Sequence, residues 1–261
     1  MLGKLMKYEW QATWKLLVPT NLLIIVMTFF ACFTVRLDFF DYKNDGVIFS
    51  AVMIIMMYVL SMFVALIGTA IYLIYRFYTS TYGDQGYLLH TLPVDKHHII
   101  IAKVLVSLAW VMISSFLMYA SILFLFNAEE DILTDFISGL QVMVEQTRDE
   151  RVSAFAVVMA FIAVIVGMLA RVLKVTACIS LGQLSSNHKL VIAFAFYFAI
   201  YIAQQTVNAF YYMFVGYINR NRAWSYGYRA SWEFALITGL IYSVVFYLLT
   251  WYVMDKKLNL D

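Results

Sequence analysis

Proline, cysteine and charged residues are all scarce in this sequence. Of its 261 residues, two are proline, two are cysteine and 13% are charged, whereas hydrophobic residues make up 64%. A soluble domain contains about 25% charged and about 45–50% apolar residues. The shortage of charge therefore excludes an ordinary water-soluble globular protein and predicts a chain embedded in a membrane.

Several signatures of enzymes and metal sites are also missing. The sequence contains neither a G-x-x-x-x-G-K-[ST] phosphate loop nor an H-E-x-x-H zinc motif. Its apolar runs lack the paired acids of an intramembrane protease. Cys32 and Cys178 lie far apart in or beside apolar runs, as is typical of small buried hydrophobic side chains. We expect no enzymatic activity, no metal site and no cofactor in the chain itself.

Long apolar runs are what the sequence has instead. A helix that crosses a bilayer needs about 20 mostly apolar residues. Six runs meet this requirement, at residues 17–35, 47–75, 104–126, 152–170, 189–215 and 234–254. The runs are continuous, whereas strands of a membrane barrel alternate over about ten residues. The sequence therefore predicts an all-α polytopic membrane protein, with a single transmembrane domain over residues 1–261.

The distribution of charge predicts the orientation of the chain. With six spans, both termini lie on one side, and eleven of the 18 lysines and arginines fall on that side. Cytoplasmic loops carry the excess of such cations. We therefore expect a multi-pass protein of the cell membrane with both termini in the cytoplasm. The net charge of +2 gives no indication of nucleic-acid binding.

Residues 2–17 form an amphipathic pattern ahead of the first run. Lysines fall on one face of the expected helix and apolar residues, with Trp14, on the other. Lysine and tryptophan together suit a helix that lies in the headgroup layer. Pro19 follows and is expected to kink or end this interfacial helix. The alternative is a helical extension of the first span.

The segment between the second and third runs, YGDQGYLLHTLPVDKHHIIIAK, has more structure than a plain loop. Gly83 and Gly86 permit a turn, a short apolar segment follows, and Pro93 stops it. Asp95 is suited to cap the next helix. Exposed apolar residues on a structured loop predict a docking site. Packing of the loop against its own helix bundle is the alternative.

Two stretches of the sequence resemble a known family. YGDQGYLLHTLPVDKHH is similar to a pattern near GDEGYLxxTLPV in the type-2 permeases of ATP-binding cassette (ABC) transporters, in the small six-span subunits of Gram-positive bacteria. LGQLSSNHK, residues 181–189, resembles their second cytoplasmic turn. Gln85 departs from the pattern, which has glutamate there. The resemblance covers the whole chain in architecture but only these stretches in specific residues.

The resemblance implies that the loop is a coupling helix seated in a groove of a separate ATP-hydrolysing subunit. The implied coupling residues are Asp84, Tyr87, Leu88, Leu89, His90, Thr91, Leu92 and Asp95. It also implies two such ATPase subunits, which bind ATP and Mg²⁺, and a second permease chain, identical or different. Lipid surrounds the assembly.

A polar stripe runs along the fifth apolar run. Its members recur at helical spacing and are Tyr197, Tyr201, Gln204, Asn208 and Tyr211. Gln205 is predicted to point elsewhere and to be structural. Polar groups at membrane depth face other helices or a water-filled path. The stripe is therefore either a set of interhelical hydrogen bonds or part of a translocation path.

Together these features predict the transmembrane subunit of an ATP-driven transporter. The aromatic, nearly uncharged spans suit export of an amphipathic cargo such as a peptide, and lipids or drugs are alternative cargoes. A passive channel or a membrane sensor without an ATPase partner is the alternative class of function.

Overall fold

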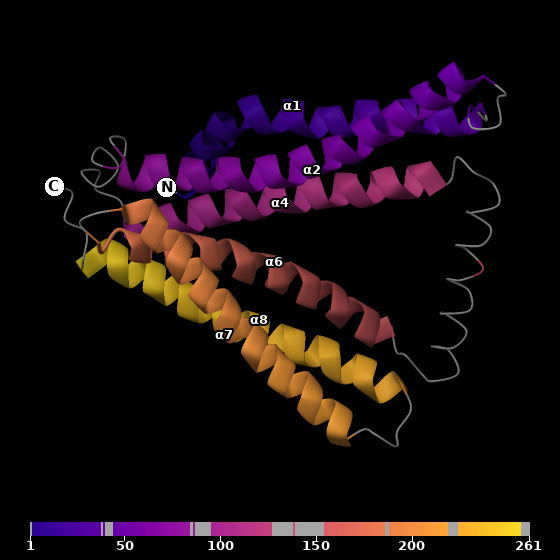
Figure 1. Cartoon of the computed structure of the whole chain (residues 1–261). Coiled ribbons are helices and arrows are strands. Elements are labelled where there is room, and N and C mark those ends of the chain that lie inside the picture. Colours follow the sequence, from indigo (N-terminus) through magenta and orange to yellow (C-terminus); the bar gives the residue numbers. More distant parts are fainter. Residues whose placement is uncertain are drawn as a thin grey trace. The chain divides into compact units, whose positions relative to one another are not determined.

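The structure of the chain is a computed structural model in which every regular element is an α-helix among the residues that it describes (Figure 1). It describes residues 2–37, 39, 44–83, 86, 95–126, 138, 154–185, 188–218 and 224–256, with side chains left out at 154–157, 218, 224–231 and 256.

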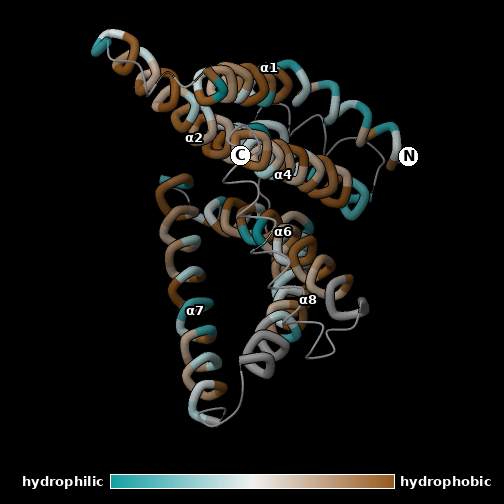
Figure 2. The backbone as a smooth tube through the Cα atoms, turned by 90° about the vertical axis from the view of Figure 1, so that its right-hand side faces the viewer, coloured by the Kyte–Doolittle hydropathy of each residue, from teal (hydrophilic) through white to brown (hydrophobic). Residues whose placement is uncertain are grey.

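Six long helices make up the described chain. They are α1 (Leu2–Arg36), α2 (Asp45–Tyr82), α4 (Lys96–Phe126), α6 (Ala154–Gly182), α7 (Lys189–Ile218) and α8 (Trp224–Lys256). Each contains a stretch long and apolar enough to cross a membrane. Helices are favoured because they satisfy every backbone hydrogen bond within one segment where no water is available. The predicted all-α fold with six candidate spans is confirmed, and the colouring in Figure 2 shows apolar residues along all six.

Helix α1 does not end at Pro19, which lies inside it. The segment expected at 2–17 is therefore the first part of a longer helix rather than a separate element. Figure 2 shows this first part running at an angle to the remainder of α1. A proline causes such a bend because it lacks an N–H and its ring crowds the preceding turn. Thr20 and Asn21 add side-chain hydrogen bonds to the carbonyls of Leu16 and Leu17 beside it, at 2.9 and 2.7 Å.

Helix α6 is longer than the apolar run that predicted it. The run was bounded at 152–170, but the helix continues to Gly182. Arg171 and Lys174 are two of the eleven cations that the sequence assigns to the side of the termini, and both lie within the helix and within its candidate span. The reason is that the apolar run resumes after each cation, so a boundary drawn at the first charge is too early.

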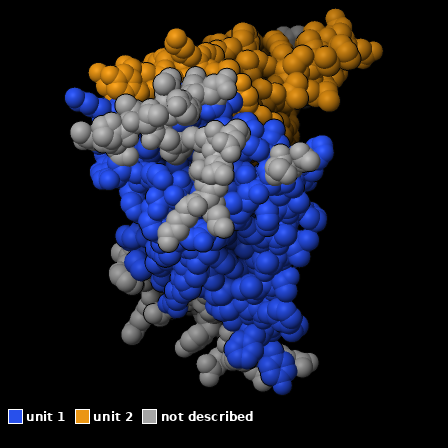
Figure 3. Space-filling model, turned by 90° about the vertical axis from the view of Figure 1, so that its left-hand side faces the viewer, with its two compact units in different colours: residues 1–6, 76–108, 150–261 blue, residues 7–75, 109–149 orange. Residues whose placement is uncertain are grey.

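The chain divides into two compact units, coloured separately in Figure 3. Unit 1 comprises residues 1–6, 76–108 and 150–261, and unit 2 comprises residues 7–75 and 109–149. Helices α2 and α4 each contribute one end to unit 1 and the other end to unit 2.

The core of unit 1 lies where α4, α6 and α8 meet. Its buried residues are Ile100, Val104, Leu173, Ala177, Phe246 and Met254. Helix α6 packs mainly on α8 and less extensively on α7. The approach of α8 to α6 is close, because a Cβ on Gly239 would lie 3.0 Å from Val166 Cγ1. In lipid this packing stabilises through van der Waals contact, since the hydrophobic effect does not drive helices together there.

Unit 2 joins α1, α2 and α4 through neutral hydroxyl groups. Thr28 Oγ1 and Tyr58 Oη lie 2.6 and 2.9 Å from Ser121 Oγ, and all three side chains are buried. Since Thr28 already donates to the Ile24 carbonyl at 2.7 Å, Ser121 donates to Thr28 and Tyr58 donates to Ser121. The result is a hydrogen-bond chain that crosses three helices, with every hydroxyl proton used.

Candidate functional site

Most of the predicted coupling residues lie outside the described residues. These are Asp84, Tyr87, Leu88, Leu89, His90, Thr91 and Leu92. Asp95 is described and immediately precedes α4. Its carbonyl accepts a hydrogen bond from the His98 N–H at 2.9 Å, and its carboxylate lies 3.7 Å from His98 Nδ1. Asp95 therefore occupies the helix-start position predicted for it.

The turn predicted at Gly83 and Gly86 is present. The Gly86 N–H donates to the Gly83 carbonyl at 2.7 Å. A Cβ on Gly83 would lie 2.7 Å from the Thr79 carbonyl oxygen, and one on Gly86 would collide with that of Thr81. Both glycines are needed because the chain folds back tightly on the last turn of α2.

The end of α2 is bonded to the end of α6. The Tyr82 hydroxyl lies 2.6 Å from Ser180 Oγ. Ser180 donates its only hydroxyl proton to the Thr176 carbonyl at 2.8 Å, so Tyr82 is the donor to Ser180. This bond joins the first residue of one stretch that carries the family resemblance, residues 82–98, to the residue that immediately precedes the other stretch, residues 181–189.

The first turn of α4 is held against the last turns of α8. Lys96 Nζ lies 3.0 Å from Asp255 Oδ1. His97 Nδ1 lies 2.6 Å from the Tyr247 hydroxyl, and its ring stacks on Trp251 with centroids 5.1 Å apart. The ion pair is about one-third exposed on each side, so it contributes at most about 1 kcal/mol. Ring packing supplies the more shape-dependent part of this contact.

A buried lysine connects the helices on either side of the loop. Lys103 on α4 is 6% exposed, and its ammonium donates to Ser80 Oγ on α2. A buried ammonium is tolerated only when it is hydrogen-bonded, so this contact fixes the spacing of α2 and α4.

We refer to these contacting residues as the helix-end cluster. Its members are Ser80, Tyr82, Lys96, His97, Lys103, Ser180, Tyr247, Trp251 and Asp255. The cluster contains no catalytic arrangement. It connects both helices that flank residues 84–94 to α6 and α8, so a movement of one of these helices would be transmitted to the others.

The structure places part of the polar stripe of α7 against α6. Lys174 Nζ donates to Gln204 Oε1 at 3.0 Å and lies 4.8 and 5.6 Å from the ring centroids of Tyr197 and Tyr201. Sequence reasoning did not select Lys174, because the fourth span was ended before it. The available signal was an isolated cation inside the apolar run VLKVTACI.

The remaining stripe residues have other partners. Gln205 donates to the Tyr201 hydroxyl at 3.2 Å and accepts from Asn208 Nδ2 at 3.3 Å. The prediction that Gln205 points away from the stripe was therefore wrong, because its long side chain reaches residues one turn away on either side. Tyr211 stacks on Phe234 of α8, with ring centroids 3.6 Å apart.

The comparisons with known proteins are negative. No protein-family model, no curated protein and no solved structure matches this chain.

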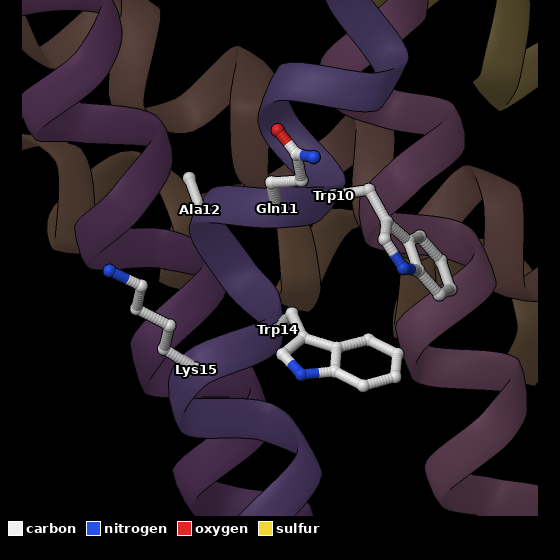
Figure 4. A pocket seen from close by; sticks show the side chains of 5 residues that line it. All are labelled: Trp10, Gln11, Ala12, Trp14 and Lys15. Carbon is white, nitrogen blue, oxygen red and sulfur yellow. The ribbon is translucent and has the colours of Figure 1, made fainter.

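A pocket on α1 in unit 2 does not form a convergent site. It is lined by Trp10, Gln11, Ala12, Trp14 and Lys15. Figure 4 shows the two indole rings on one side of the helix and the Lys15 ammonium on the other. Trp10 stacks on Trp110 of α4 with centroids 4.7 Å apart, so the wall of the pocket serves helix packing.

Proposed function

We propose that the chain is the transmembrane subunit of an ATP-driven ABC transporter, with a separate ATP-hydrolysing subunit acting on the loop between α2 and α4. The observation that carries the proposal is the Tyr82–Ser180 hydrogen bond, which places the start of one family-like stretch beside the residue that precedes the other. The bond supports the proposal because a coupling surface assembled from two loops requires such adjacency.

The contacts on the other side of the loop support the same function. A movement of residues 84–94 would act on α4, whose first turn is bonded to α8 through Lys96 and stacked on it through His97. It would also act on α2, which is bonded to α6 through Tyr82. Force applied to residues 84–94 would thus reach α2, α4, α6 and α8. Transport requires such a connection when the ATP-hydrolysing subunit lies outside the bilayer.

The proposal includes the partners and the cargo. Two permease chains and two ATPase chains form the working unit, and the ATPase chains hold ATP and Mg²⁺. The termini lie in the cytoplasm, and the first part of α1 lies in the headgroup layer. Export of an amphipathic cargo such as a peptide is supported by the aromatic side chains of α7, which are largely exposed.

Charged substitutions in the loop test this function. Leu88→Glu and Leu92→Glu should reduce transporter-stimulated ATP hydrolysis at least about tenfold, because a buried carboxylate would face an apolar groove of the partner at a cost of about 1.4 kcal/mol or more. Hydrolysis is measured on the assembled complex in lipid nanodiscs.

Leu37→Glu provides the matched control. Leu37 is 44% exposed at the end of α1, so the same substitution there should leave hydrolysis unchanged. Undiminished assembly and hydrolysis in both loop variants would reject the proposed coupling role.

A further inference from the structure

Lys174 is a buried cation within a candidate membrane span. It lies eight residues before the end of α6 and is 7% exposed. Charged side chains at such positions are costly, and they usually mark ligand sites, ion paths or charge pairs.

No charge pair accounts for Lys174 within the part of the chain that the structure describes. Within that part, no carboxylate oxygen lies within 4.0 Å of the Lys174 ammonium. Its one hydrogen bond goes to Gln204, a neutral acceptor. An ammonium has three N–H donors, so two remain for another acceptor.

Two aromatic rings lie beside the Lys174 ammonium. Tyr197 and Tyr201 present their rings to the ammonium, which stabilises its charge. These tyrosines are 36% and 44% exposed, so their rings are accessible from outside the chain. Their hydroxyl groups can donate to an oxyanion that approaches the ammonium.

We propose that Lys174, Gln204, Tyr197 and Tyr201 form a binding subsite for the anionic group, a carboxylate or a phosphate, of an amphipathic ligand. The ammonium supplies the charge, the tyrosines supply hydroxyl donors and apolar ring faces, and the exposed aromatic residues of α7 contact the ligand's apolar part. This inference deepens the proposed transport function by naming the ligand class, but binding itself requires no ATPase partner.

Equilibrium binding to the full chain tests the subsite. The chain is placed in nanodiscs of neutral phosphatidylcholine and titrated with decyl phosphate, decanoate, decanol and inorganic phosphate, with empty nanodiscs subtracted. We expect saturable binding of decyl phosphate or decanoate, with weaker binding of decanol and inorganic phosphate. Lys174→Gln should weaken binding of the anionic amphiphile at least about tenfold, because it removes a charge-assisted contact.

Two further variants separate charge from folding. Lys174→Arg keeps the charge and should retain binding within about threefold, and Gln204→Glu places an internal carboxylate beside the ammonium and should weaken binding as Lys174→Gln does. Arg171→Gln is the matched control, since Arg171 is an exposed cation three residues earlier on α6, and it should leave the affinity unchanged.

The outcomes distinguish a phosphate ligand from a carboxylate ligand. They also separate a failure of the subsite from a failure of the proposed transport function. Binding of decyl phosphate alone supports a lipid-like headgroup, and binding of both anions supports a carboxylate cargo as well. Equal affinities in wild type, Lys174→Gln and Gln204→Glu, or an equal loss in Arg171→Gln, would overturn the subsite. Because no nucleotide is present, such a failure leaves the ATP-dependent function to its own test.

Discussion

Units 1 and 2 hold their helices together with different chemistry. In unit 2 a chain of neutral hydroxyl groups from Tyr58 through Ser121 to Thr28 joins three helices and uses every hydroxyl proton. In unit 1 they include ammonium, carboxylate and imidazole groups, as in the contacts of Lys96, His97 and Lys174. A closed set of neutral bonds favours one rigid arrangement, whereas a partly exposed ion pair such as Lys96–Asp255 is broken at low cost.

This difference assigns separate roles to the two units. Unit 2 has the properties of a scaffold, and unit 1 has the contacts that flank the proposed coupling loop and the proposed ligand subsite. The comparison predicts that damage to the hydroxyl chain of unit 2 lowers stability alone, while loss of a contact in the helix-end cluster of unit 1 alters coupling more than stability.

The largest effect is expected at the turn between α6 and α7. A Cβ on Gly182 would lie 2.6 Å from the Lys189 carbonyl oxygen and 2.7 Å from Ala193 Cβ, so Gly182→Ala should destabilise the protein by about 2–3 kcal/mol. Denaturant titration in mild detergent measures the change. Gly167→Ala is the control, because nothing lies within 4 Å of a Cβ there, and it should be neutral or slightly stabilising. Equal stability of the two variants would show that the turn is not close-packed.

A smaller effect is expected at the hydroxyl chain of unit 2. Ser121→Ala leaves the buried Tyr58 hydroxyl without its acceptor and should cost about 1–2 kcal/mol in unfolding free energy. Hydrolysis by the intact complex should not change, because the substitution lies in the scaffold. Ser50→Ala is the control, since Ser50 is exposed and bonds only to its own turn, and it should cost less than about 0.5 kcal/mol. A loss of hydrolysis without a loss of stability in Ser121→Ala would contradict the division of roles.

Two matched tyrosine substitutions, one in each unit, should change stability least and separate the roles of the units most clearly. Tyr82→Phe removes the bond to Ser180 in unit 1, and Tyr72→Phe removes a 3.1 Å bond to the Ala12 carbonyl in unit 2. Each should cost about 0.5–1 kcal/mol. Only Tyr82→Phe should lower ATPase stimulation, by about threefold or more, when both complexes are assayed side by side. Equal stimulation in the two variants would show that the Tyr82–Ser180 bond does not contribute to coupling.

The helices themselves could be predicted from the sequence because each span needs only a local run of apolar residues. The limits of that reasoning appear at charged and special residues. Lys174 was placed in a loop because the partners that make its burial tolerable, Gln204 and two tyrosines, come from another helix. Pro19 was expected to kink or end a helix; α1 continues through it with a bend, and the sequence alone did not decide between these two outcomes. Gln205 was misplaced because a long side chain reaches beyond its own helical face.

Co-purification tests whether the chain works with a separate ABC ATPase subunit. The tagged chain is extracted from its native membrane in mild detergent, and its partners are identified by mass spectrometry together with an assay of ATP hydrolysis. The account predicts a stoichiometric ABC ATPase subunit and hydrolysis that is lost with Leu88→Glu. A chain that purifies without any ATPase, both before and after cross-linking, would contradict the account and favour a passive channel or a membrane sensor.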